Sequence, residues 1–139
     1  MKKKIMKILS VGLMMGMIVG TNAFAAVPTR RETIFLDFNQ QWNGRAAISR
    51  TGDYSTVYAR CYSVYPADGG TDNYTKIQAK ISTIAGVDIS DVVTLNETAT
   101  SNTSISIKEG YLSTTSIRFS FRGNNPDYSA YADVYQEGR

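Results

Sequence analysis

Apolar and polar residues alternate with a period of two along most of this chain, most regularly in residues 117–135. Alternation of this kind predicts strands with one buried and one exposed face. The segment between the two alternating runs, residues 123–128 (GNNPDY), is rich in residues that favour turns. We therefore predict a β-hairpin over residues 117–135. Its expected inward positions are Ile117, Phe119, Phe121, Ala130, Ala132 and Val134.

The predicted hairpin has a defined register, because a shift of one residue would turn one arm inside out. The loop length favours Phe121 opposite Ala130, with the other inward pairs following in step. On the outer face this register places Arg118 opposite Asp133, an opposite-charge pair across the strands.

Six further segments have the pattern of strands. They follow an extended lead-in over residues 26–33 and comprise residues 34–38, 45–50, 54–65, 76–82, 92–95 and 104–108. In the longest, we expect the smaller and less charged side chains to point inward, namely Val57, Ala59, Cys61, Ser63 and Tyr65. About seven or eight short strands without a helix indicate an all-β protein, most simply a single antiparallel β-sandwich of Ig-like or jelly-roll-like type.

The N-terminal residues have the features of a signal peptide rather than of folded structure. Three lysines at residues 2–4 precede an apolar run over residues 8–20, and Ala23-Phe24-Ala25 gives a small-x-small cleavage pattern. The run is shorter than the ~20 residues that a membrane-spanning helix needs. We expect cleavage after Ala25, release from a bacterial cell, no stable membrane insertion, and one mature domain over residues 26–139.

Removal of this segment changes the charge of the protein. Of the 15 basic side chains, four are lysines of residues 1–25, which leaves 11 against 12 acidic ones. A nearly neutral protein has no general attraction for nucleic acid or anionic lipid. We therefore expect no nucleic-acid partner.

Residue types exclude several kinds of catalytic centre. The chain has no histidine and a single cysteine, so Ser–His and Cys–His nucleophile pairs and histidine-based metal sites are ruled out. The aspartates are scattered over predicted turns, where Asp is favoured for local hydrogen bonding. We predict a protein that is not an enzyme and needs no cofactor.

Two further features have both a structural and a functional interpretation. The loop from Asp68 to Asn73 (DGGTDN) is rich in oxygen ligands for calcium but lacks the spacing of an EF-hand, so a glycine-rich turn is favoured. Cys61 is expected to point inward as a small hydrophobe, and an intermolecular disulfide linking a homodimer is the alternative.

Aromatic residues are the remaining candidates for a binding site. The nine tyrosines and single tryptophan suit ordinary strand packing, but on neighbouring strands they would also form an aromatic strip for a ligand. The candidate contact residues are Tyr58, Tyr62, Tyr131, Tyr135 and Trp42.

The function predicted from these features is binding to a glycan or protein partner outside the cell. A secreted bacteriocin-like or membrane-active effector is the main alternative, although the neutral charge speaks against attack on anionic lipid. A hydrolase that uses two carboxylates is the third hypothesis.

Overall fold

The computed structural model describes residues 26–50, 54–67 and 75–139. Nine strands and one short 3₁₀ turn are found in these ranges. They are β1 (Thr29–Leu36), β2 (Asn43–Gly44), β3 (Ile48–Ser49), β4 (Thr56–Pro66), β5 (Lys76–Thr83), β6 (Val93–Asn96), β7 (Thr103–Ser106), the 3₁₀ turn η1 (Glu109–Tyr111), β8 (Ser116–Gly123) and β9 (Ala130–Glu137). The all-β prediction is confirmed, with nine strands rather than seven or eight.

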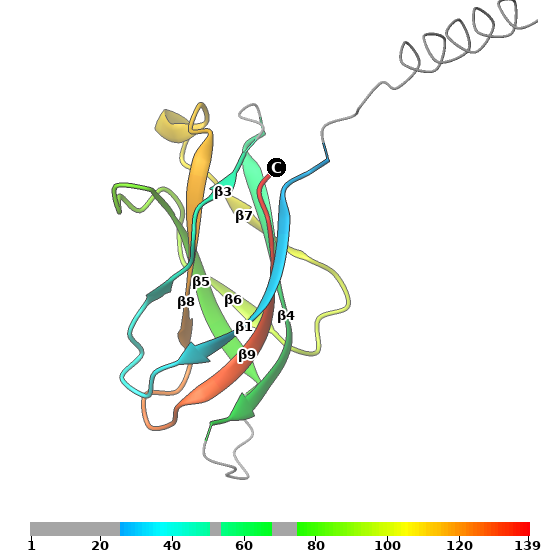
Figure 1. The fold of residues 1–139 in the computed structure, drawn as a ribbon, viewed down its shortest axis with the longest axis vertical. Helices are drawn as coiled ribbons and strands as arrows, with labels where there is room; N and C mark the ends of the chain where they lie inside the picture. The colour runs from blue at the N-terminus through cyan, green and yellow to red at the C-terminus, as the bar shows by residue number, and fades with distance from the viewer. Residues whose placement is uncertain (1–25, 51–53, 68–74) are drawn as a thin grey trace, which may run out of the picture.

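The strands form two antiparallel sheets, which lie as two layers (Figure 1). One sheet has the order β1-β9-β4-β7, and the other has the order β2-β8-β5-β6, with β3 also paired to β8. Only β5 and β6 are both consecutive in the chain and paired with each other. Most other connections pass from one sheet to the other, so strands that follow one another in sequence usually belong to opposite sheets.

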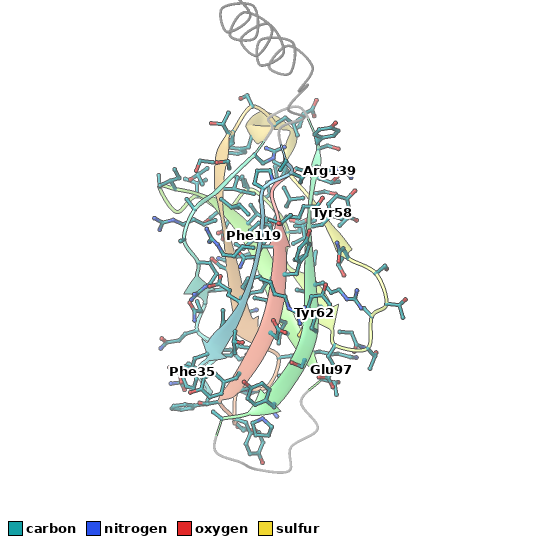
Figure 2. All side chains as sticks on the ribbon, turned by 45° about the vertical axis from the view of Figure 1, so that its right-hand side comes forward. Phe35, Tyr58, Tyr62, Glu97, Phe119 and Arg139 are labelled. Atoms are coloured by element: carbon teal, nitrogen blue, oxygen red, sulfur yellow. The ribbon has the colours of Figure 1, made fainter. Side chains whose placement is uncertain are left out.

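The core between the sheets is built from the alternating positions that the sequence marks. Both sheets contribute aliphatic side chains to it, and the two largest fully buried side chains are Phe119 and Phe121 of β8. Their rings lie 6.3 Å apart and nearly parallel. Ala132 of β9 contributes a small side chain to the same cluster from the other sheet. Figure 2 shows Phe119 in this interior position.

The predicted hairpin is wrong in its pairing and right in its faces. All six expected inward residues are buried, but β8 pairs with β5, β2 and β3, whereas β9 pairs with β1 and β4. Phe121 lies opposite Ala79, and Ala130 lies opposite Leu36. Residues 124–129 therefore cross between the sheets. Asp133 pairs with Arg31 of β1 and not with Arg118, which lies opposite Ser82.

The first strand also differs from the expectation. Residues 29–33, predicted as a lead-in, are part of β1 and pair with β9 over their whole length. The strand ends at Leu36, so Phe38 does not continue the inward series and is exposed.

A β-bulge in β4 changes the face of its last residues. The register with β9 shifts between Cys61 and Ser63. Val57, Ala59 and Cys61 are buried as predicted, but beyond the bulge Val64 packs against the core and Tyr65 is exposed. The expectation that Tyr65 points inward is therefore wrong, because one extra residue reverses the alternation.

Polar side chains close the edge between β1 and the β2–β3 segment. The Glu32 carboxylate accepts hydrogen bonds from Arg45, at 2.7 and 3.0 Å, and from the Gln136 amide at 2.7 Å. Arg30 donates to the carbonyl oxygens of Ala46 and Ala47. Hydrogen-bonding to Arg45 holds the pKa of Glu32 below its ordinary value, although partial burial acts against this shift.

Candidate functional site

The outer face of the β1-β9-β4-β7 sheet carries four of the five aromatic residues predicted as contacts. An aromatic strip requires these tyrosines to lie on neighbouring strands, and β4 and β9, which carry them, are neighbours. They do not form one continuous strip, however. Figure 2 shows Phe35 and Tyr58 toward opposite ends of the sheet, with Tyr62 between them.

At one end of this face, three aromatic rings stand side by side on three adjacent strands. Tyr131 of β9 lies opposite both Phe35 of β1 and Tyr65 of β4. The ring centroids of Phe35 and Tyr131 are 5.5 Å apart in an edge-to-face arrangement, and those of Tyr65 and Tyr131 are 5.7 Å apart and stacked. Phe35, Tyr131 and Tyr65 remain 44%, 38% and 47% exposed. We call these three residues the aromatic row.

The middle of the face is charged. Arg31 and Asp133 form an ion pair at 2.6 Å, and the guanidinium carbon of Arg31 lies 4.0 Å from the centre of the Tyr62 ring. Arg60 approaches the same ring at 4.6 Å. Tyr62 is thus in contact with two cations, and its ring is less available to a ligand than the sequence suggested.

The remaining two predicted tyrosines are engaged with neighbouring groups. The half-buried Tyr135 donates a hydrogen bond to Glu137 at 2.9 Å, and burial together with this carboxylate raises its pKa to about 12. Tyr58, toward the opposite end from the aromatic row, accepts a hydrogen bond from Arg139 at 3.4 Å. Neither residue belongs to the aromatic row.

The bulge that exposes Tyr65 is held by the loop between β6 and β7. The backbone N–H of Val64 donates to the Glu97 carboxylate at 2.9 Å, and Arg60 donates to the carbonyl oxygen of Ala99 at 2.8 Å. Glu97 lies beside this part of β4 (Figure 2). The loop thus fixes the local irregularity on which the third member of the aromatic row depends.

Trp42 lies over the other sheet. It immediately precedes β2, and its ring lies 4.4 Å from the guanidinium carbon of Arg122 and 4.7 Å from the Lys80 ammonium. It also borders a cavity beside the loop that joins β1 to β2. The prediction grouped Trp42 with the tyrosines, but the structure places it apart from all four.

Phe35 and Tyr65 are site residues that the sequence analysis did not select. Phe35 could have been found, since it occupies the outward phase of a strand whose neighbours in sequence, Ile34 and Leu36, are inward. Tyr65 could not, because the bulge that turns it outward has no marker in the sequence.

Cys61 is buried, as predicted, and its thiol donates a weak hydrogen bond to the carbonyl oxygen of Ser63 at 3.5 Å. Burial, with a smaller contribution from Glu97, raises the pKa of the thiol to about 12. The side chain therefore stays protonated and serves as a small apolar group of the core.

Within the three described ranges, no group of three or more His, Cys, Asp or Glu residues is placed to hold a metal ion. The loop from Asp68 to Asn73, predicted as a glycine-rich turn with calcium binding as the alternative, lies outside them. No helix of the described part of the chain is long and apolar enough to cross a membrane.

No protein-family model matches this sequence, and a search of curated proteins finds no relative. Any assignment of function therefore depends on the surface and cavity described above.

Proposed function

We propose that this chain is a small secreted binding protein, without catalytic activity, that attaches to a protein partner outside the cell through the outer face of the β1-β9-β4-β7 sheet. The observation that carries the proposal is the aromatic row, three exposed rings in contact on three adjacent strands. Aromatic side chains at the centre of a contact surface, with polar residues around them, are typical of protein interfaces.

The arrangement of the rings favours a protein partner over a saccharide. Tyr131 and Tyr65 are stacked, so each covers part of the other. Phe35 contacts Tyr131 edge to face from β1, on the other side of β9. Little of the Tyr131 ring face remains for a sugar ring to lie on. Apolar side chains of a protein can pack over such a cluster, while the tyrosine hydroxyl groups bond at its margin.

The charged residues beside the aromatic row supply the polar margin of the proposed contact. Asp133 is the next outward residue of β9 after Tyr131, and its ion-pair partner Arg31 lies beyond Thr33 on β1. Because the two charges largely neutralise each other, they favour a partner surface of mixed charge. They would set the orientation of the complex more than its strength.

The sheet order supports a β-sandwich of the jelly-roll type. A four-stranded and a five-stranded layer face one core, and the chain crosses between them at most connections. Jelly rolls occur in many lectins and viral coat proteins. This analogy supports a binding role only in general terms, since one fold serves many functions.

Cell-surface binding tests the proposal directly. Fluorescently labelled mature protein, residues 26–139, is incubated with intact cells of the producing strain and of related strains. We expect Tyr131→Ser and Tyr65→Ser to reduce binding at least tenfold, and Tyr54→Ser to leave it unchanged. Tyr54 is the matched control, an exposed tyrosine outside the aromatic row.

Treatment of the cells identifies the class of partner. Protease treatment should abolish binding, whereas periodate oxidation of surface glycans should leave it intact. The reverse result would show a glycan partner and contradict the proposal. Killing of the target cells at the same concentrations would favour the effector hypothesis instead.

A further inference from the structure

A cavity of 310 Å³ lies beside the loop that joins β1 to β2, at the Phe35 end of the aromatic row. Its volume is at the lower end of the ~300–1,000 Å³ usual for small-molecule sites, which suits one ring-sized ligand. Of the residues that the structure describes, those lining it are Phe35, Asp37, Gln41, Trp42, Asn43 and Gly44.

The aromatic wall of the cavity is held in place from the sheet side. Trp42 lies against the cationic groups of Arg122 and Lys80. Each cation has a further partner, since Arg122 donates to the side-chain oxygen of Gln78 at 2.6 Å and Lys80 pairs with Asp88 at 2.8 Å. The indole is therefore anchored by groups that do not line the cavity themselves.

Two polar side chains of the lining are available to a ligand, and a third is not. The Asn43 amide donates to the carbonyl oxygen of Phe35 at 2.8 Å and accepts from Arg45 at 3.0 Å, so it fixes the wall. Within the described ranges, the Asp37 carboxylate and the Gln41 amide form no hydrogen bond or ion pair. Together they offer several acceptors and two N–H donors.

The loop has a strained backbone between these two side chains. Gln40 has a φ of +54°, a backbone conformation that residues other than glycine rarely adopt. Its N–H donates a hydrogen bond to the carbonyl oxygen of Asp37 at 3.3 Å. Strained residues of this kind cluster at ligand sites, where the surrounding structure maintains them.

We propose that this cavity binds a neutral saccharide through one pyranose ring. The apolar C–H face of the ring would lie on Trp42 or Phe35, and its hydroxyl groups would bond to Asp37 and Gln41. An anionic sugar is disfavoured by the Asp37 carboxylate. A cationic ligand is disfavoured because Lys80 and Arg122 already lie within 5 Å of the indole ring. The site shares Phe35 with the proposed protein contact, whereas Tyr131 and Tyr65 do not line it.

The single tryptophan of the chain makes the site directly observable, because fluorescence excited at a wavelength specific to tryptophan reports on Trp42 alone. The mature protein is titrated with glucose, galactose, mannose and N-acetylglucosamine, each up to about 50 mM. For a single ring in a shallow site we expect dissociation constants in the millimolar range. At least one sugar should give a saturable change in Trp42 emission.

Variants of the polar lining then test the geometry. Asp37→Asn and Gln41→Ala should each weaken that binding at least fivefold while leaving thermal melting unchanged, and Asp127→Asn, an exposed aspartate of another loop, should have no effect. The proposal is wrong if no neutral sugar gives a saturable change, if glycerol or glucuronic acid gives an equal one, or if both lining variants bind as the unmodified protein does. The Tyr131→Ser protein should still bind the sugar, so failure of the protein contact and failure of this site are separate results.

Discussion

The backbone of Gly138 lies directly against the carbonyl group of Ser49. A Cβ atom at position 138 would overlap the Ser49 carbonyl oxygen and approach the Ile48 side chain. The Gly138 N–H also donates to the carbonyl oxygen of Pro28 at 2.9 Å. The start of β1 and the ends of β3 and β9 therefore meet here, with no room for a side chain at position 138.

Gly138→Ala should destabilise the fold. The methyl group requires the backbone at Ser49 or Gly138 to move, and overpacking of this kind costs about 1–3 kcal/mol. Urea unfolding followed by circular dichroism measures the change. Gly110→Ala is the matched control, since nothing lies within 4 Å of a Cβ built there. Equal stability of the two variants would show that the ends of β3 and β9 are not packed as described.

Phe119→Ala should be among the most destabilising single substitutions. The ring is fully buried in β8 against Phe121, and its loss leaves a cavity in the core, which costs about 3–5 kcal/mol. Arg118→Ala, on the exposed face of the same strand, should stay within about 0.5 kcal/mol. Arg122→Ala is a poorer control, because Arg122 contacts Trp42 and Gln78.

The Glu32 ion pair should make stability depend on pH. Pairing with Arg45 lowers the pKa of Glu32 in the folded state below the ordinary 4.5. A lowered folded-state pKa stabilises the protein fully above the unfolded-state value, and this contribution is lost as the pH falls through the folded-state value. Unfolding free energies measured by urea titration between pH 7 and pH 3 should therefore decrease more steeply than in Glu32→Gln.

The same variant tests the role of the pair at neutral pH. Glu32→Gln leaves the half-buried Arg45 without its charged partner and should cost about 1–2 kcal/mol at pH 7. Glu109→Gln, an exposed acid of the 3₁₀ turn, should change neither the stability at pH 7 nor its dependence on pH. A parallel pH dependence in both variants would mean that other carboxylates determine it.

The sequence predicts the faces of the strands better than their partners. Phe119 and Ala132 are both correctly predicted to be buried, because alternation reports which side of a strand meets the core. Their predicted pairing fails, because two inward faces can meet either within one sheet or across two sheets. The choice depends on the neighbours that β1 and β4 supply to β9, and these are far away in sequence.

For the candidate site, too, the sequence predicts only part of the arrangement. The adjacency of Tyr65 and Tyr131 depends on a bulge that Glu97 stabilises from a distant loop. Trp42 is conspicuous in the sequence, but the cavity beside it is formed by the path of the connection between the sheets. Residue types indicate aromatic contacts, whereas their grouping comes from long-range packing.

The mature protein should begin at Ala26. Edman sequencing of protein recovered from the culture medium should read Ala-Val-Pro-Thr-Arg, because Ala23 and Ala25 form the small-x-small cleavage pattern. Recovery of the chain only in the membrane fraction, with Met1 retained, would contradict both the export that the proposed function requires and the nearly neutral charge expected of the mature protein.

Cys61 should react with a thiol reagent only when the protein unfolds. Its side chain is buried in β4 and its pKa is raised to about 12, so almost no thiolate is present or accessible at pH 8. Reaction with Ellman's reagent should follow the urea unfolding transition, whereas Ser104→Cys in a Cys61→Ala background should react at once from its exposed position on β7.

The unfolded thiol ionises near pH 9 and the folded thiol near 12, so stability should fall as the pH rises through this interval. That decrease should be smaller in Cys61→Ala, and rapid reaction of native Cys61 would contradict its place in the core.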